Sequence, residues 1–284
     1  MLRLPFGTAG FALTWMAILA SPGARAANLL VNPGFELPDA SGGDATGIIG
    51  WTEFGAPFTR FVTRLTPANS GLQCLKMFGP FDFFGGGTGV VQRVPASAGQ
   101  TWLAQVWSMN SSADAMQGGN FCVLKLEFYD AVGQFAGGAP VLGVNYQEVR
   151  VADAASPLDV WLPFSITLTA PPGTAFAQIV LVEVQLTQPF AGGAVFLDDA
   201  FLDQVCALHD PVFDTNDDAV IDENDLAVFD ACFTGPAIPL ADSAAIECRC
   251  LDVNGDNAID LQDYGVFQRC YTGAGGVVDP SCDD

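Results

Sequence analysis

The sequence predicts a mainly β protein: an antiparallel β-sandwich followed by a small module of short helices. Three observations lead to this fold class. Apolar and polar residues alternate in short runs, clusters of Gly and Pro separate these runs, and an acidic segment is repeated near the C-terminus. Of the 284 residues, 50% are hydrophobic, which is enough to build a core and excludes intrinsic disorder.

The alternating runs are the candidate strands. Turn-forming segments such as 85–87 and 171–173 lie between them, and no convincing helical period is present in this part of the chain. Short strands at this spacing favour two packed antiparallel sheets. The runs are residues 101–107, 122–128, 177–184 and 194–199.

The first 26 residues have the features of a secretory signal peptide. Arg3 precedes an apolar run at 11–20, and the segment ends in small residues around Arg25. The run is shorter than the roughly 20 residues that span a bilayer, so we expect cleavage rather than a membrane anchor. The expected organisation is a signal peptide at 1–26, a sandwich domain at 27–206 and a tail at 207–284, in a secreted or cell-surface protein without membrane insertion.

The charge balance argues against one class of partner, and the acidic residues are unevenly distributed along the chain. The chain has 32 Asp and Glu against 10 Lys and Arg, a formal charge of −22. Nucleic-acid binding needs a basic surface, so this composition argues against it. Residues 207–284 contain 17 of the acids and 2 of the bases, so the excess is concentrated in the tail.

Catalytic signatures are weak. His209 is the single histidine, which removes the base of a Ser/His/Asp arrangement. Nothing in the sandwich domain singles out the carboxylate pair that a glycosidase needs. We therefore expect no enzymatic activity.

The two ends of the sandwich domain carry a family resemblance. The segments 28–36, 50–52 and 195–202 resemble bacterial jelly-roll carbohydrate-binding modules of the galactose-binding-like fold. This implies a jelly roll that binds a polysaccharide or another glycan. In that family a Glu of the opening motif and an Asp of the closing one commonly hold a structural Ca²⁺, which here implies Glu36 and Asp198.

Strand alternation gives Asp198 a direction. It places Asp198 on one face with Phe196, Ala200 and Leu202, pointing toward the core, where a carboxylate needs a cation or several donors. Asp199 is the substitute ligand. The alternative is that these acids cap strand ends in solvent.

Aromatic rings are the expected platforms for a sugar, because ring faces stack on the apolar faces of pyranoses. In the first candidate strand, Trp102 shares a face with core residues and Trp107 lies on the other face. The Gly-rich segment 78–87 either contacts ligand or forms a packed lid. The expected ligand-binding residues are Trp51, Phe81, Phe83 and Trp107.

The acidic repeat has the pattern of a calcium loop. Residues 214–225 recur as 252–263, with oxygen-bearing side chains at positions 1, 3, 5, 9 and 12 and Ile at position 8. Ca²⁺ takes six to eight hard oxygens, which alternate residues of a tight loop and one backbone carbonyl supply. The expected ligands are Asp214, Asn216, Asp218, the carbonyl of Val220, Asp222 and Asp225, then Asp252, Asn254, Asp256, the carbonyl of Ala258, Asp260 and Asp263.

The two loop–helix repeats resemble a type I dockerin. The resemblance implies two Ca²⁺ ions and a cohesin-like or other protein partner for the tail. Position 6 is Ala219 and Asn257 instead of Gly, and a left-handed backbone strains Ala more than Asn, so we expect the first site to be weaker. Positions 10 and 11 depart from the small hydroxyl residues often found in dockerins that bind cohesin.

Eight cysteines agree with an oxidising compartment. Cys74 and Cys122 are expected to form a disulfide, with two free buried thiols as the alternative. Among the fifteen connectivities open to the six tail cysteines, repeat symmetry favours Cys232–Cys248 and Cys270–Cys282. This leaves Cys206–Cys250 as the third expected pair.

Two functions remain. The first is a secreted, non-catalytic binding protein with a polysaccharide-binding jelly roll and a calcium-dependent tail for attachment or assembly. The second is a structural or adhesive cell-surface protein, in which the jelly roll binds protein and calcium makes the tail a rigid connector.

Overall fold

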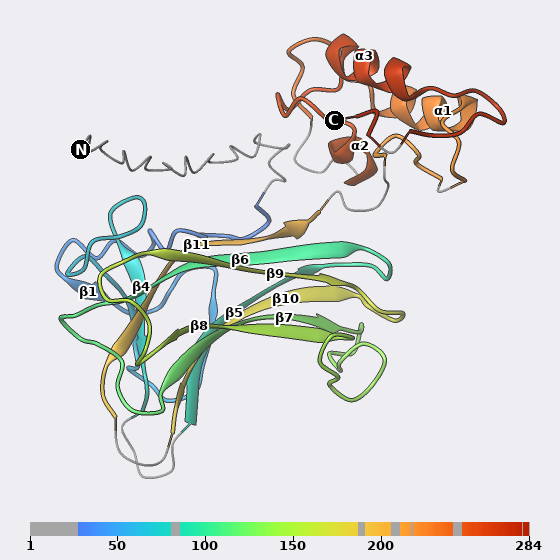
Figure 1. Ribbon diagram of the computed structural model, residues 1–284. Helices are drawn as coiled ribbons and strands as arrows, with labels where there is room; N and C mark the ends of the chain where they lie inside the picture. Colours follow the sequence, from blue (N-terminus) through green and yellow to red (C-terminus); the bar gives the residue numbers. More distant parts are fainter. Residues whose placement is uncertain are drawn as a thin grey trace, which may run out of the picture.

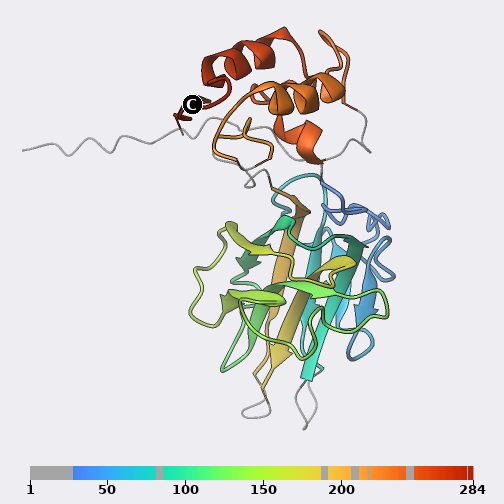
Figure 2. The same cartoon turned by 90° about the vertical axis from the view of Figure 1, so that its right-hand side faces the viewer.

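The computed structural model describes residues 28–80, 86–186, 191–205, 211–216, 218–240, 246–279 and 281–283. These residues form a β-sandwich and a separate helical cluster at one end of it (Figures 1 and 2). The expected signal peptide, Phe81, Phe83 and Cys206 lie outside the described residues.

Two antiparallel sheets make up the sandwich. The first sheet has the strand order β1-β3-β4-β11-β6-β9 and the second has the order β2-β5-β10-β7-β8. The first comprises β1 Asp44–Ala45, β3 Arg60–Thr63, β4 Cys74–Phe78, β11 Ala194–Gln204, β6 Thr101–Asn110 and β9 Leu162–Thr169. The second comprises β2 Thr52–Phe54, β5 Gly86–Pro95, β10 Phe176–Gln185, β7 Phe121–Tyr129 and β8 Tyr146–Asp153.

Period-2 alternation builds the core between the sheets. On β10, Ala177, Ile179 and Leu181 point inward and are fully buried. Trp102 on β6 is also in this core, as expected. Each of the four sequence runs lies within a strand, so the prediction of an antiparallel sandwich is confirmed.

The closing strand β11 changes phase at a bulge. The register shifts between Asp198 and Phe201, and Asp199 has a φ of 46°. Phe196 packs on the outer face of the six-stranded sheet, whereas Ala200 and Leu202 belong to the core. The expectation that these residues share one face is therefore wrong, because one extra residue in a strand reverses the faces of all residues after it.

The expected disulfide between Cys74 and Cys122 is not formed in the structure. Both thiols are free and buried. Cys74 packs with Phe196 on the outside of the six-stranded sheet, whereas Cys122 lies in the core between the sheets. A layer of backbone separates the two side chains, so the alternative of two free thiols is the one that holds.

The tail consists of three short helices around a small core of its own. Helix α1 spans Glu223–Cys232, α2 spans Ile246–Cys250 and α3 spans Leu261–Cys270. Among the described residues, no helix has the length and apolar character needed to cross a membrane. The largest buried side chains of the tail core are Phe213, Phe229 and Phe267, which pack with Ile221 and Ile259.

Disulfides connect the ends of the tail helices. Cys232–Cys248 and Cys270–Cys282 are both present, which confirms two of the pairs expected from repeat symmetry. Cys250 is also disulfide-bonded. These bonds stabilise a module whose core is small.

The two repeats of the tail hold each other. The amide of Ile221 donates to Thr272 Oγ1 after α3, and the amide of Ile259 donates to Thr234 Oγ1 after α1, at 3.1 and 3.0 Å. Thr272 and Thr234 in turn donate their amides to the carbonyls of the same isoleucines. The position-8 isoleucines therefore tie each loop to the end of the other repeat's helix.

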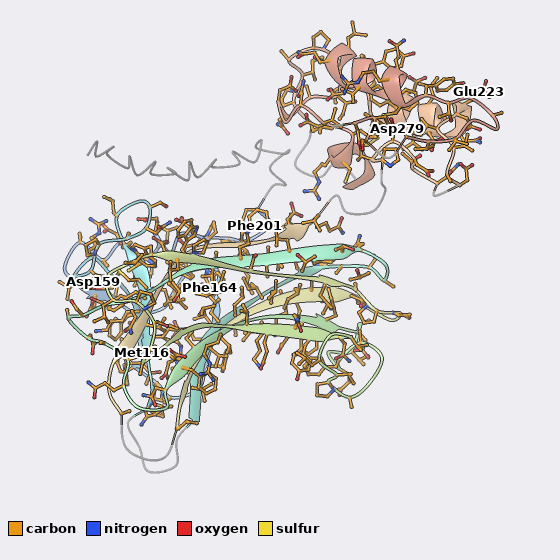
Figure 3. The ribbon with its side chains drawn as sticks, viewed as in Figure 1. Met116, Asp159, Phe164, Phe201, Glu223 and Asp279 are labelled. Atoms are coloured by element: carbon orange, nitrogen blue, oxygen red, sulfur yellow. A yellow bond between two sulfur atoms is a disulfide. The ribbon has the colours of Figure 1, made fainter. Side chains whose placement is uncertain are left out.

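Among the described residues, an ion pair joins the sandwich to the tail. Arg249 Nη1 on α2 lies 2.9 Å from Asp203 Oδ2 on β11, and the Asp203 side chain is fully buried. Burial raises the pKa of Asp203 and the charge of Arg249 opposes this rise. Phe201, nearby on β11, is in the part of the strand that leads toward the tail (Figure 3).

Candidate functional site

A groove of about 480 Å³ lies on the outer face of the five-stranded sheet. Its size is within the range of sites for small ligands or short stretches of polymer. The side chains that line it come from all five strands of this sheet: Phe54, Val91, Phe121, Val123, Lys125, Glu127, Glu148, Gln178, Val180, Val182 and Val184.

One half of the groove is apolar. Val123, Val180 and Val182 form its floor with 5–7% of each residue exposed, and half-buried Phe54 and Phe121 stand beside them. This small cluster is separate from the sandwich core. It lies outside because β7 and β10 carry apolar residues on both faces.

Phe54 depends on a glycine opposite it in the sheet. Phe54 pairs with Gly89, and a Cβ added to Gly89 would lie 2.6 Å from the Phe54 ring. The Phe54 ring therefore lies against the backbone of residue 89, which the side chain of any residue other than Gly would cover. This close approach places an aromatic wall at the apolar half of the groove.

The other half of the groove is polar, and its groups are already paired. Lys125 Nζ lies 2.7 Å from Glu148 Oε2. Glu127 Oε2 accepts hydrogen bonds from Tyr129 Oη at 2.8 Å and Gln178 Nε2 at 3.1 Å. Burial is the main cause that raises the pKa of Tyr129, so this hydroxyl stays a donor. The polar half thus presents fixed donors and acceptors.

The structure does not bring the expected ligand-binding aromatics together. Trp51 is 7% exposed, stacks near Phe35 at 5.1 Å between ring centroids and donates Nε1–H to the carbonyl of Asn32. Its ring is part of the core, which corrects the expectation of a surface platform. Trp107 pairs with Asp198 of β11 and so lies half-buried on the outer face of the other sheet.

Sequence reasoning missed the groove because its residues have the composition of a core. The run Ile179–Val182 is apolar without interruption, so it gives no sign that Val180 and Val182 face outward. Gln178 and Glu127 could have revealed the groove. Alternation places Gln178 on the same face of β10 as Val180 and Val182, and Glu127 pairs with Gln178, so these polar residues mark an outer face.

The predicted pair Glu36 and Asp198 does converge. Together with Asp199, these side chains have atoms within 4 Å of where a Cβ of Gly34 would be. Asp198 Oδ2 accepts the amides of Asn69 and Ser70, at 2.8 and 3.2 Å. Asp198 therefore points outward but is fully buried, because the loop before β4 covers it.

The electrostatics of this cluster are those of confined negative charge. Burial raises the pKa of Asp198 to about 7, and the neighbouring Asp199 charge adds to the rise, while backbone N–H donors oppose it. Burial first, then Asp198 and Glu36, raise the pKa of the Cys74 thiol to about 12. Glu36 Oε1 accepts the amide of Leu72 at 2.8 Å, and Gly71, at a φ of 64°, leaves the room for it.

The two tail loops have the same internal hydrogen bonds. In each loop, the position-12 carboxylate accepts the amides of positions 2 and 9: Asp225 from Thr215 and Asp222, and Asp263 from Val253 and Asp260. The position-1 residues, Asp214 and Asp252, accept amides from positions 5 and 6.

Position 6 of each loop has the left-handed backbone expected from the repeat. The φ values of Ala219 and Asn257 are 62° and 67°. Burial raises the pKa of Asp252 and of Asp263, with amide donors opposing it. Within the described residues, no group of three or more His, Cys, Asp or Glu side chains is arranged around a metal-sized space.

The comparisons with known proteins find likeness in shape alone. No protein-family model matches the chain, and no curated protein matches it. Among solved structures, TmCBM61 in complex with β-1,4-galactotriose has 20% identity and a TM-score of 0.42, over 63% of this chain and 99% of that one. A family 16 carbohydrate-binding module has 17% identity and a TM-score of 0.40, over 62% and 99%.

Two further structures show the breadth of this likeness. The CBM22-1 xylan-binding domain of Paenibacillus barcinonensis Xyn10C has 17% identity and a TM-score of 0.36, over 55% of this chain and 85% of that one. The enzymatically active domain of a bacteriophage CBA120 tailspike has 13% identity and a TM-score of 0.43, over 63% and 21%. At such values the function has to be argued from this chain's own residues.

Proposed function

We propose that the chain is a secreted, non-catalytic binding protein. Its groove on the five-stranded sheet takes a polysaccharide, and its tail binds two Ca²⁺ ions and serves in attachment or assembly. The observation that carries the first part is the pairing of an aromatic and aliphatic floor with fixed polar groups in one groove. Sugars present apolar ring faces and hydroxyl edges, and this groove offers a surface for each.

We propose a groove without catalytic activity because its two carboxylates are engaged in other contacts. Glu148 pairs with Lys125, and Glu127 accepts hydrogen bonds from Tyr129 and Gln178. These contacts suit a recognition surface. The terminal motifs that resemble carbohydrate-binding modules support the same function.

The calcium part of the proposal rests on the chemistry of the donor sets. Each loop offers side-chain oxygens at five positions and has the left-handed residue where the loop turns. A carboxylate has about four lone-pair sites, so the amide hydrogen bonds within the loop leave capacity for a cation. The likeness of the repeats to a dockerin adds a protein partner for the tail. We extend the proposal to a third Ca²⁺ at Glu36 and Asp198, where confined negative charge calls for a counter-ion.

An array of immobilised polysaccharides tests the binding function. We expect the full chain to bind at least one neutral polysaccharide, and Phe54→Ala and Phe121→Ala each to weaken binding about tenfold or more, since stacking aromatics dominate such contacts. Trp107→Ala is the matched control, because it removes an aromatic ring from the outer face of the opposite sheet.

The outcomes separate the candidate sites. Loss of binding in Trp107→Ala alone would move the site to the six-stranded sheet. A blank array with capture of a protein at the cell surface would favour the adhesive function instead.

Calorimetric titration of Ca²⁺ into the chelator-treated full chain tests the ions. We expect Asp225→Asn, Asp263→Asn and Asp198→Asn each to remove one binding event, with Asp279→Asn as the control outside the loops. At a free concentration one hundred times Kd, each ion adds about 2.7 kcal/mol to the free energy of unfolding. Absence of heat in the parent chain would contradict the calcium proposal.

A further inference from the structure

The side chains of the groove are arranged from apolar to polar, and this arrangement narrows the class of ligand that the groove can bind. Three rows of paired residues cross the five-stranded sheet from β5 toward β8. The first row is Gly89, Val182, Val123 and Arg150; the second is Val91, Val180, Lys125 and Glu148; the third is Arg93, Gln178, Glu127 and Tyr146. The surface therefore changes from apolar to polar within the width of the groove.

The apolar end has no group that can hydrogen-bond a hydroxyl among the described lining side chains. Phe54 and Phe121 flank Val123, Val182 and Val184 there. The guanidinium of Arg150 lies over the Phe121 ring at 4.4 Å and pairs with Asp153, and Arg150 is not among the side chains that line the groove. A sugar hydroxyl seated at this end would lose its water without gaining a partner, which is unfavourable.

The polar end carries charges of both signs. Its lining contains two carboxylates, Glu127 and Glu148, and the ammonium of Lys125, which pairs with Glu148. Exposed Arg93 stands beside them in the third row and donates Nε–H to Gln178 Oε1 at 3.0 Å. Sugar hydroxyls can bond to the lone pairs and N–H groups that these contacts leave free.

We infer that the groove recognises a polysaccharide carrying O-acetyl groups. The sugar hydroxyls lie over Lys125, Glu127, Gln178 and Glu148, and the acetyl methyl group contacts Val123, Val182 and Phe54. This inference rests on the proposed polysaccharide-binding function and assigns the substituent that the apolar end selects. The apolar end of the groove then buries a methyl group, where an unsubstituted sugar would place a hydroxyl without a hydrogen-bond partner.

A matched pair of polymers tests the inference. Acetylated xylan and the same batch deacetylated with mild alkali are titrated into the full chain in the presence of calcium. We expect the acetylated polymer to bind roughly fivefold more tightly, the factor for burying about one methyl group. Acetylated and deacetylated glucomannan provide a second pair with a different backbone.

Two near-isosteric variants locate the preference. Val182→Thr and Val184→Thr place a hydroxyl in the apolar end, and we expect the affinities for the two polymers to become equal within a factor of two. Val132→Thr is the control, because Val132 is 81% exposed in the loop between β7 and β8. Circular dichroism confirms that each variant is folded, and either groove variant alone suffices.

Each result has one meaning. A parent chain that binds acetylated and deacetylated polymers equally would overturn the acetyl inference and leave polysaccharide binding standing. A parent chain that binds neither polymer of either pair, nor any polysaccharide on the array, would overturn the proposed function and the inference with it. A preference that survives in both groove variants would also overturn the inference, because the apolar end would not be its source.

Discussion

In the sandwich, two long-stranded sheets share one continuous core and leave Cys74 and Cys122 as free thiols. In the tail, a few phenylalanines and isoleucines form the core, and disulfides connect the helix ends. This difference between the two regions follows from their lengths. A short segment buries a smaller fraction of its surface and needs covalent or ionic support.

The two regions also treat buried carboxylates differently. Asp225 and Asp263 in the tail are fully buried, and each accepts several hydrogen bonds from its own loop. Glu183 on β10 is fully buried in the sandwich, and neither of its carboxyl oxygens has a hydrogen-bond partner among the described residues. In the tail, amide donors oppose the rise in pKa that burial causes, as at Asp263, whereas no described donor opposes that rise at Glu183.

The largest effect is expected at Glu183. Burial raises its pKa to about 8 from an ordinary value of 4.5. The folded chain therefore keeps a proton that the unfolded chain has released, and its contribution to stability falls as pH rises from 4.5 to 8. We expect Glu183→Gln to remove this fall and to raise the free energy of unfolding at pH 9 by roughly 5 kcal/mol, at about 1.4 kcal/mol per tenfold change in proton affinity.

Urea denaturation at pH 4.5, 7 and 9, followed by tryptophan fluorescence, measures this difference. Glu148→Gln is the control, since that carboxylate is on the outer face and paired with Lys125. A Glu183→Gln variant that keeps the pH dependence of the parent chain would contradict the raised pKa of this carboxyl.

The next effect concerns the disulfides of the tail. Cys232 and Cys248 are 16 residues apart, and a bond closing a loop of this size contributes about 3 kcal/mol. We expect Cys232→Ala with Cys248→Ala to lower the stability of the tail by that amount and to leave the sandwich transition unchanged in calorimetry. A reducing agent should act in the same way on the parent chain. A fall in both transitions would mean that the two regions unfold together.

The smallest effect compares the two loops of the tail. Ala219 and Asn257 are both left-handed at position 6, and this backbone costs Ala about 1–2 kcal/mol. We expect Ala219→Gly to stabilise the tail by about 1 kcal/mol and Asn257→Gly by less, because Asn tolerates this conformation. Thermal melts in chelator measure both changes, and the reverse order would show that strain is not what distinguishes the loops.

Much of the fold could be predicted because its signals are local. Alternation identified four of the long strands, β6, β7, β10 and β11, but not β5, β8 or β9. The 38-residue offset of the repeat aligned both loops and two of the disulfides. The convergence of Glu36 and Asp198 was expected from the resemblance of the terminal strands. By contrast, no local signal separated Trp51 in the core from a surface ring.

The sequence by itself determined four of the long strands, which lie in β6, β7, β10 and β11, and where acidic oxygens gather in the tail. The tertiary structure decided which face of each strand is covered. The bulge after Asp198 reversed the faces of β11, the backbone layer between Cys74 and Cys122 prevented a disulfide, and Val180 and Val182 became the floor of an outer groove. The physical reason is that period-2 alternation defines two faces, but only the packing of the second sheet and its loops determines which face meets solvent.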